Sequence, residues 1–239
     1  MEDEQPARIQ QLGPDERVCY TYDLPVAPRA LVVLAHGLSG DRVGPAWVLS
    51  RLAAAVAHAG YAVLRCDAPG SGDSAGQFGT STLSEAAQAL AAGARSTAVA
   101  ELPVVCLGLS TGGVVAVETT QLLGDRVLGT LCLSSDLLEM TESPQVPITL
   151  RNGEFHLFAR FAADRARLRP RSDLVESGRR FAFALGERDA EIVDAVGDLR
   201  ALSPERLDVV PDAGHVFGSP ATQQLLKELV LDALERWLP

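Results

Sequence analysis

The sequence has almost no lysine and no excess of basic charge. Lys227 is the only lysine, and Lys and Arg together number 21 against 31 for Asp and Glu, a formal net charge of −10. Because nucleic acids are bound chiefly through many cationic contacts to phosphate, this balance argues against a nucleic-acid partner. It equally disfavours a polybasic segment that would hold the chain at an anionic membrane surface.

Long apolar runs are also missing. No stretch approaches the roughly 18 apolar residues of a membrane-spanning helix, since the apolar residues 52–64 form a shorter run that includes His58. The first residues, M-E-D-E-Q-P, carry acids where a secretory signal has basic residues followed by an apolar segment. We therefore expect no membrane partner and a cytoplasmic location.

Cysteines are few and do not form a ligand pattern. The four are widely spaced, with no C-x-x-C pair: Cys19, Cys66, Cys106 and Cys132. The last three lie in or beside apolar, strand-like runs, which favours small buried core residues over disulfides or metal ligands. This pattern fits a reducing compartment and predicts no metal site.

What the chain does contain is an ordinary globular composition arranged in alternating segments. With 239 residues, 47% hydrophobic and 22% charged, it suits a single domain spanning residues 1–239. Short β-rich runs alternate with Ala/Leu-rich stretches, which predicts βα units around a mostly parallel sheet. Strands are expected at residues 30–35, 61–66, 104–109, 127–133, 180–185 and 206–210, and an exposed antiparallel edge strand or hairpin at 17–24. Helices are expected at residues 46–59, 82–100, 111–123, 190–202 and 222–237.

This alternation stops between residues 134 and 179. The gap before the next strand is far longer than one helix with its usual loops, which predicts a cap or lid over residues 136–179. Its centre, residues 153–168, has apolar side chains at helical spacing and predicts an amphipathic helix. Phe155, His156 and Phe158 are candidate substrate contacts there, although these aromatics equally suit seating the helix on the body.

Residues 108–113, G-L-S-T-G-G, carry the sharpest functional signal. They follow an apolar run and precede a helix-like segment, so a G-x-S-x-G pattern sits in a strand–turn–helix context. A serine at so tight a turn takes strained backbone angles, and glycines on both sides remove side-chain clashes. The alternatives are phosphate loops, but Gly113 is followed by Val114 rather than lysine, and the glycines of residues 70–76 lack dinucleotide spacing. Ser110 is therefore the candidate nucleophile.

A serine nucleophile needs a base and an orienting carboxylate. Of the four histidines, His215 lies in a loop after the last expected strand and is the best candidate base; His36 ends a strand, His58 suits a helix surface and His156 lies in the cap. Asp189 follows the preceding expected strand, which gives the order Ser, Asp, His. Glu187 and Asp136 remain competitors for the acid, and Asp212 suits loop capping.

The oxyanion formed during acyl transfer needs two donors. Residues 31–35 run into H-G-L-S-G at 36–40, whose glycines allow the backbone to turn towards the serine. Together with the turn at Ser110, this places the candidate donors at the backbone N–H groups of Leu38 and Thr111.

These pieces together resemble the α/β-hydrolase superfamily over nearly the whole chain. The motifs occur in the family's order: residues 36–40, D-A-P-G-S-G-D-S at 67–74, 108–113, G-E-R-D at 186–189 and G-H at 214–215. Residues 36–74 look most like small bacterial serine esterases of the feruloyl/cinnamoyl-esterase and prolyl-aminopeptidase-like branch. The resemblance implies an α/β-hydrolase fold with about eight mostly parallel strands, a small helical cap after the sixth strand, and a Ser-His-Asp triad with no metal or organic cofactor. It also makes His36 a structural residue of the oxyanion loop. The residues flanking the serine, Leu109 and Thr111, depart from the family's commonest elbow.

The function expected is a carboxylesterase- or thioesterase-like serine hydrolase that works through an acyl-enzyme. Two alternatives stay open: the same triad used for acyl elimination, acyl transfer or cyclisation, and a ligand-binding protein without catalysis. Residues 141–180 hold eight arginines and five acids. This local positive charge favours an anionic or carrier-tethered acyl substrate, or else forms a solvated helix face. The oligomeric state is not readable from the sequence.

Overall fold

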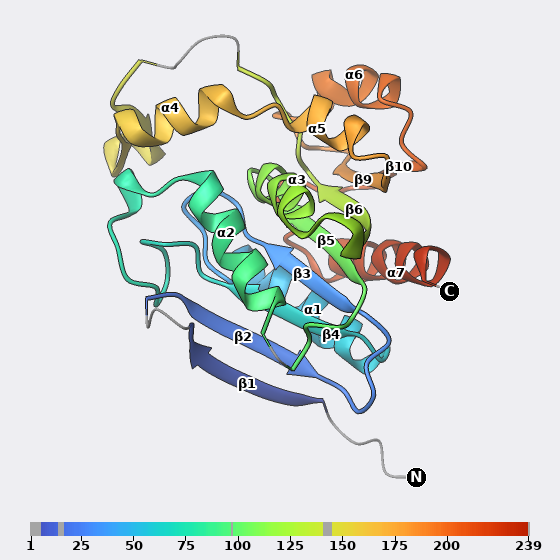
Figure 1. Cartoon of the computed structure of the whole chain (residues 1–239). Helices are drawn as coiled ribbons and strands as arrows, with labels where there is room; N and C mark the ends of the chain where they lie inside the picture. Colours follow the sequence, from blue (N-terminus) through green and yellow to red (C-terminus); the bar gives the residue numbers. More distant parts are fainter. Residues whose placement is uncertain (1–5, 14–16, 97, 141–144, 239) are drawn as a thin grey trace.

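The expected strands pair into one eight-stranded sheet in a computed structural model of the chain, which describes residues 6–13, 17–96, 98–140 and 145–238 (Figure 1). The sheet order is β1-β2-β4-β3-β5-β6-β9-β10. Its strands are β1 (Ala7–Leu12), β2 (Cys19–Leu24), β3 (Leu31–Ala35), β4 (Ala62–Cys66), β5 (Val104–Leu109), β6 (Val127–Leu133), β9 (Arg180–Gly186) and β10 (Arg206–Val210). From β4 to β10 neighbouring strands are parallel, whereas β2 pairs antiparallel with both β1 and β4. The predicted fold class is confirmed.

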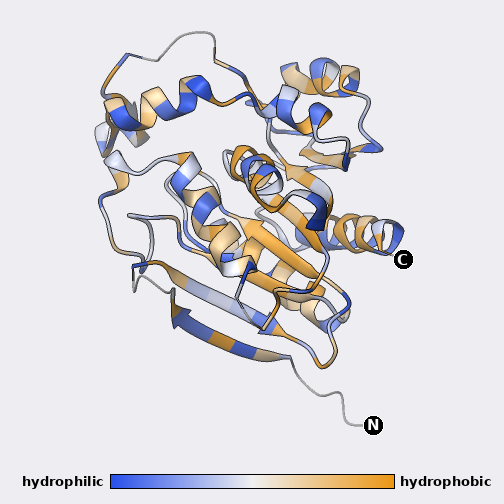
Figure 2. Ribbon diagram, in the orientation of Figure 1, coloured by the Kyte–Doolittle hydropathy of each residue, from blue (hydrophilic) through white to orange (hydrophobic). Residues whose placement is uncertain are grey.

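Helices cover both faces of this sheet. The main ones are α1 (Val48–His58), α2 (Leu83–Ala94), α3 (Gly112–Leu123), α6 (Val196–Ala201) and α7 (Pro220–Trp237). α1 and α7 pack on one face, and α2 and α3 on the other (Figures 1 and 2). In β3, Val33 faces α2 and α3 while Val32 and Leu34 face α1 and α7. Because both faces of the central strands are buried, their sequences are continuously apolar, which is why they were predictable.

The expectation of an exposed edge at residues 17–24 is wrong. β2 lies inside the sheet, and β1, which the sequence analysis missed, forms the exposed edge. The polar residues that alternate in β2 suggested solvent, yet Thr21 and Asp23 are only 1% and 3% exposed. They are buried against arginines, since Arg65 and Arg42 donate to Asp23 and Thr21. The alternation therefore reflects a buried polar cluster.

The 136–179 segment holds a small hairpin and two helices. β7 (Ile148–Leu150) pairs antiparallel with β8 (Phe155–Leu157), and α4 (Ala159–Arg167) and α5 (Pro170–Glu176) follow. The predicted helix over 153–168 is thus wrong in its first part. Asn152 and Gly153 both adopt positive φ, 56° and 96°, which turns the chain back into a hairpin before a helix can begin.

This segment is fastened to the beginning of α2. The Phe158 N–H donates to the Gly79 carbonyl at 2.9 Å. Asp164 of α4 is buried and accepts from the Ser84 N–H at 3.1 Å, where the first turn of α2 has unpaired donors and a positive dipole end. At the same helix start, Thr82 and Glu85 form a capping box.

Cysteine burial follows the sequence expectation. Cys66, Cys106 and Cys132 are buried in the core, and burial raises the pKa of the Cys106 and Cys132 thiols to about 12. Thiolate formation there is suppressed, so these side chains act as small apolar groups. Among the residues described, no helix combines the length and hydropathy needed to cross a bilayer.

The turn from β5 into α3 is closed by contacts that only glycine permits. A Cβ on Gly108 would lie 1.9 Å from the Gly112 carbonyl oxygen, and a Cβ on Gly112 would lie 2.4 Å from that of Ala35 in β3. Ser110 between them adopts φ 56°, the left-handed region. The two glycines therefore let the turn, the helix start and the end of β3 touch.

We expect Gly108→Ala to destabilise the fold by about 1–3 kcal/mol, because the added methyl group meets backbone that cannot rotate away. Urea unfolding measures this. Gly197→Ala in α6 is the matched control: an added Cβ there meets nothing within 4 Å, so the change should be neutral or slightly stabilising. Equal stability of the two variants would contradict the packing argument.

Candidate active site

Ser110 lies at the carboxyl edge of the sheet, immediately after β5. Its own N–H donates to the Leu133 carbonyl at 2.8 Å, which ties the turn to the end of β6. Its carbonyl accepts from the Gly113 N–H at 2.8 Å. The backbone is thus held on both sides, and the Oγ projects from a rigid, positive-φ turn.

His215 and Asp189 come from the loops after β10 and β9 and meet Ser110. His215 Nε2 lies 2.8 Å from Ser110 Oγ, and His215 Nδ1 lies 2.8 Å from Asp189 Oδ2. Because a carboxylate only accepts, Nδ1 carries the ring proton and Nε2 is left to accept the serine hydroxyl proton. Asp189 is 2% exposed, so its charge is directed at the imidazole with little screening by water.

The competing residues lie elsewhere. Glu187 accepts from the Asp212 N–H, and Asp136 accepts from the Leu138 N–H within its own loop. His58 is exposed on α1 and His156 is exposed on β8. Asp189 and His215 are therefore the partners that the structure brings to Ser110.

The sequence analysis overlooked a second carboxylate beside the imidazole. Glu191 Oε2 lies 3.8 Å from His215 Nδ1, on a side chain that is 76% exposed. The Glu191 N–H also donates to Asp189 Oδ1 at 3.2 Å. The only sequence signal for Glu191 was its position two residues after Asp189. That position becomes informative only when the structure of the turn after β9 is known.

The loop after β3 lies against the serine, as expected for oxyanion donors. A Cβ on Gly37 would lie 3.2 Å from Ser110 Cβ. The Gly37 carbonyl accepts from the Gly40 N–H at 3.1 Å and lies 2.8 Å from His36 Nδ1. Since the peptide is planar and trans, fixing this carbonyl fixes the opposite direction of the Leu38 N–H. Thr111 directly precedes α3, so its N–H belongs to the positive end of that helix.

His36 has a structural place in this loop. The Ala68 N–H donates to its Nε2 at 2.9 Å, so the proton is on Nδ1, which donates to the Gly37 carbonyl. Burial lowers the pKa of His36, which keeps the ring neutral and this pattern of donors intact.

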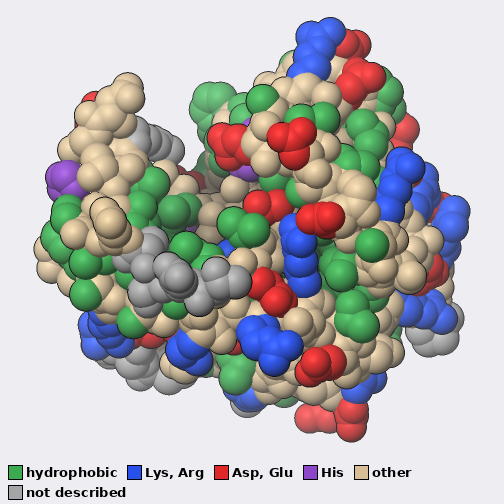
Figure 3. Space-filling model, turned by 90° about the horizontal axis from the view of Figure 1, so that it is seen from above, with side chains coloured by type: hydrophobic (Ala, Val, Ile, Leu, Met, Phe, Trp, Pro, Cys, Tyr) green, Lys and Arg blue, Asp and Glu red, His purple; other side chains and the backbone are tan. Residues whose placement is uncertain are grey.

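A pocket opens beside Leu38 and Thr111 and extends under the start of α2. Its free volume is about 40 Å³, and it is partly open to solvent. Seen from above, one face of the molecule is hollowed (Figure 3). The lining is mostly apolar with a few hydroxyls and comprises His36, Gly37, Leu38, Ser39, Ala68, Pro69, Ser71, Phe78, Ser81, Thr82, Leu83, Ala86, Thr111, Val115 and Phe161.

The cap residues singled out from the sequence do not line this pocket. Phe155 packs edge-on against Phe78 from behind, with ring centroids 5.5 Å apart, while His156 is exposed and Phe158 is 42% exposed. Phe161, one turn further, is buried and lines the pocket instead. The hairpin moves the start of the helix to Ala159 and so changes which aromatic faces inward.

The arginines of the cap region are mostly engaged in structural bonds. They donate to carbonyls and acids on neighbouring segments: Arg160 to Glu85 and Thr80, Arg165 to Leu138, Arg167 to Asp164 and Ser84, Arg171 to Asp136 and Asp198, Arg179 to Asp125, and Arg180 to Arg236. These arginines therefore fasten the segment to its neighbours.

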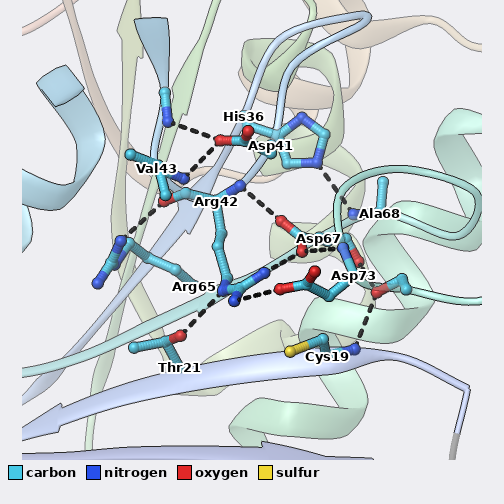
Figure 4. Close-up of polar contacts among 12 residues, drawn as sticks. Cys19, Thr21, His36, Asp41, Arg42, Val43, Arg65, Asp67, Ala68 and Asp73 are labelled. Atoms are coloured by element: carbon cyan, nitrogen blue, oxygen red, sulfur yellow. Dashed lines mark hydrogen bonds and ion pairs between the residues drawn. The ribbon is translucent and has the colours of Figure 1, made fainter. Parts of the chain in front are cut away.

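One cluster of metal-type ligands exists among the described residues. Ligand atoms of Cys19, Asp67 and Asp73 lie within 4.8 Å of one another. The guanidinium of Arg42 bonds to both carboxylates, however, and supplies the positive charge that a cation would bring (Figure 4). The cluster therefore fits an ion-pair network better than a metal site.

Comparisons with known proteins agree with this fold. A search of curated proteins gave no significant match. Among solved structures, the ferulic acid complex of Est1E from Butyrivibrio proteoclasticus is similar with a TM-score of 0.80 at 16% identity, covering 96% of this chain and 98% of that one. A dienelactone hydrolase from Anabaena variabilis has a TM-score of 0.71 at 16% identity, covering 99% and 100%. The esterase domain of a Rhodothermus marinus protein has a TM-score of 0.70 at 17% identity, covering 98% and 99%.

At these identities the solved structures establish the fold. The family model described as serine aminopeptidase, S33, matches residues 26–181. The match contains Ser110, and Asp189 and His215 lie beyond it, so the geometry alone brings those two to the serine. The chain belongs to the S33 serine aminopeptidase family of the α/β-hydrolase superfamily.

Proposed function

We propose that the chain is a serine hydrolase that cleaves carboxylic esters or thioesters of small acyl groups through an acyl-enzyme. The observation that carries the proposal is the pair of 2.8 Å contacts joining Ser110 Oγ to His215 Nε2 and His215 Nδ1 to Asp189. A hydroxyl, an imidazole in the accepting tautomer and a buried carboxylate in this order match the requirements of a nucleophile, a base and its orienting acid.

Acylation follows from these positions. His215 Nε2 takes the Ser110 proton as Oγ attacks the carbonyl carbon, and the carbonyl electron pair moves to oxygen. The N–H groups of Leu38 and Thr111 donate hydrogen bonds to that negatively charged oxygen. As the tetrahedral intermediate collapses, the proton on Nε2 passes to the departing alcohol or thiol.

Deacylation repeats the same steps with water. Water gives a proton to His215 Nε2 and adds to the acyl carbon, and the second intermediate expels Ser110 Oγ, which regains its proton. Asp189 stays ionised and stabilises the imidazolium in both halves of the cycle.

We expect Ser110→Ala to abolish labelling by a fluorophosphonate and to reduce ester hydrolysis by roughly 10⁴-fold or more, because the nucleophile is lost. Intact mass spectrometry and a p-nitrophenyl acetate assay measure these effects, with unchanged circular dichroism as the folding control. Labelling of the variant would remove Ser110 from the mechanism. A wild-type protein that neither labels nor hydrolyses esters would favour the ligand-binding alternative.

The pocket supports an apolar acyl group. Its walls include the side chains of Leu83, Ala86 and Phe161. Ferulic acid is bound to Est1E, which supports a small ester as the substrate.

We expect Phe161→Ala to shift the preference towards longer chains. Removing the ring enlarges the pocket, so kcat/KM for p-nitrophenyl octanoate should rise at least about fivefold relative to acetate. Phe158→Ala is the matched control, since that phenylalanine lies in the same segment but outside the lining. An unchanged ratio in the Phe161 variant, or equal shifts in both variants, would contradict this assignment of the acyl pocket.

A further inference from the structure

The loop that carries the Leu38 N–H is held at both ends by one dipeptide, which directly follows the neighbouring strand β4. At the near end, the Ala68 N–H donates to His36 Nε2 at 2.9 Å. At the far end, Asp67 Oδ1 accepts from the Arg42 N–H at 2.7 Å. Asp67 and Ala68 follow β4, so the loop after β3 is bracketed by its neighbour (Figure 4). The segment between these two attachments contains Leu38.

Asp67 is itself anchored in place. Its N–H donates to the Cys19 carbonyl at 3.1 Å, and its carbonyl accepts from Ser74 Oγ at 2.8 Å. Its carboxylate, which is fully buried, accepts from the Asp73 N–H at 2.8 Å as well as from Arg42. Gly72 passes so close that a Cβ there would lie 2.2 Å from Oδ2. The carboxylate is a fixed point around which the loop of residues 67–76 is wrapped.

Arg42 is gripped through its backbone and its side chain together. Its N–H bonds to Asp67, and its carbonyl accepts from Arg65 Nη1 at 2.8 Å. Its guanidinium bonds to the Asp67 carboxylate, and its Nε reaches Thr21 Oγ1 at 3.1 Å. No sheet ladder orients this residue. Its N–H and carbonyl are held by Asp67 and Arg65, and Asp41 Oδ1 accepts from the following Val43 N–H at 2.8 Å (Figure 4).

Such burial is a poor way to gain stability. Removing two charges from water costs free energy that their attraction barely returns, and a well-packed apolar pair of the same volume is often as stable. What the ionic pair provides beyond packing is direction, because a guanidinium and a carboxylate bond only in a few geometries. The Asp67–Arg42 pair is thus better explained by the loop it orients than by its contribution to stability.

We infer that Asp67 and Arg42 are positioning residues of the proposed hydrolase, which hold the Leu38 N–H at the oxyanion through the backbone of the 36–42 loop. This rests on the proposed function. Neither side chain lines the pocket, so the pair acts on the transition state and leaves substrate binding almost unchanged. Displacement of the donor by a fraction of an ångström weakens the bond that forms only as charge develops on the carbonyl oxygen.

The test is Asp67→Asn, which keeps the shape but removes the charge that fixes Arg42. We expect kcat for p-nitrophenyl acetate to fall about 10–100-fold with KM within about threefold, and the inhibition constant of a trifluoromethyl ketone to rise by a similar factor, since its adduct carries the oxyanion. Rates are expressed per site titrated with fluorophosphonate, which counts only folded protein. Arg42→Lys keeps the positive charge but loses the planar guanidinium with its several donors. It should also lower kcat and raise the inhibition constant of the trifluoromethyl ketone.

Asp208→Asn is the control. Asp208 is a partly buried acid whose carboxylate pairs with Arg206 on β10, and no bond joins this pair to the 36–42 loop. The variant should lower the thermal midpoint while leaving kcat per titrated site within about twofold. A normal kcat in the Asp67 variant, or equal losses in both, overturns the inference while the wild type remains an active hydrolase. A wild type that neither labels nor turns over refutes the proposed function itself.

Discussion

The register between β3 and β5 is the constraint on which the site depends. Ala35 pairs with Gly108, so the two strands end side by side and their loops leave the sheet together. The loop of residues 36–42 and the turn at Ser110 therefore meet without any segment reaching across the molecule. The same rule gathers the loops after β9 and β10 at this edge, because ligand sites in parallel sheets form where the carboxyl ends of the strands converge. A shift of one residue in this pairing would separate the hydroxyl from its surroundings.

The sequence predicts a residue's role well where neighbours in the sequence determine that role, and poorly where contacts from distant segments determine it. The central strands are apolar because both their faces are buried, and Gly108 is required by a clash inside the turn of residues 108–113 itself; both features were readable. β2 was misjudged because Thr21 and Asp23 are buried by arginines distant in the sequence. The sequence did not point to Phe161 because a hairpin sets where α4 begins, and the periodicity of the segment alone cannot locate that start.

The dominance of arginine over lysine has a structural counterpart in this fold. Arg126 donates to three backbone carbonyls, those of Ala94, Val99 and Leu102, at 3.0–3.1 Å. Arg171 bonds twice to the Asp136 carbonyl and also to Asp198. A planar group with several donors can serve partners on separate segments at once, whereas an ammonium group concentrates its donors at one point. Many guanidinium groups of this chain therefore serve to connect loops by hydrogen bonds.

The bond from Asp164 to the first turn of α2 links access to the pocket with the integrity of a helix. The carboxylate on α4 satisfies the Ser84 N–H, and Phe161, three residues earlier, closes the pocket. Any motion that lifts α4 leaves a buried acid without that donor and the helix start without its anion. The position of α4, and with it the Phe161 wall of the pocket, therefore depends on the same bond that satisfies the first turn of α2.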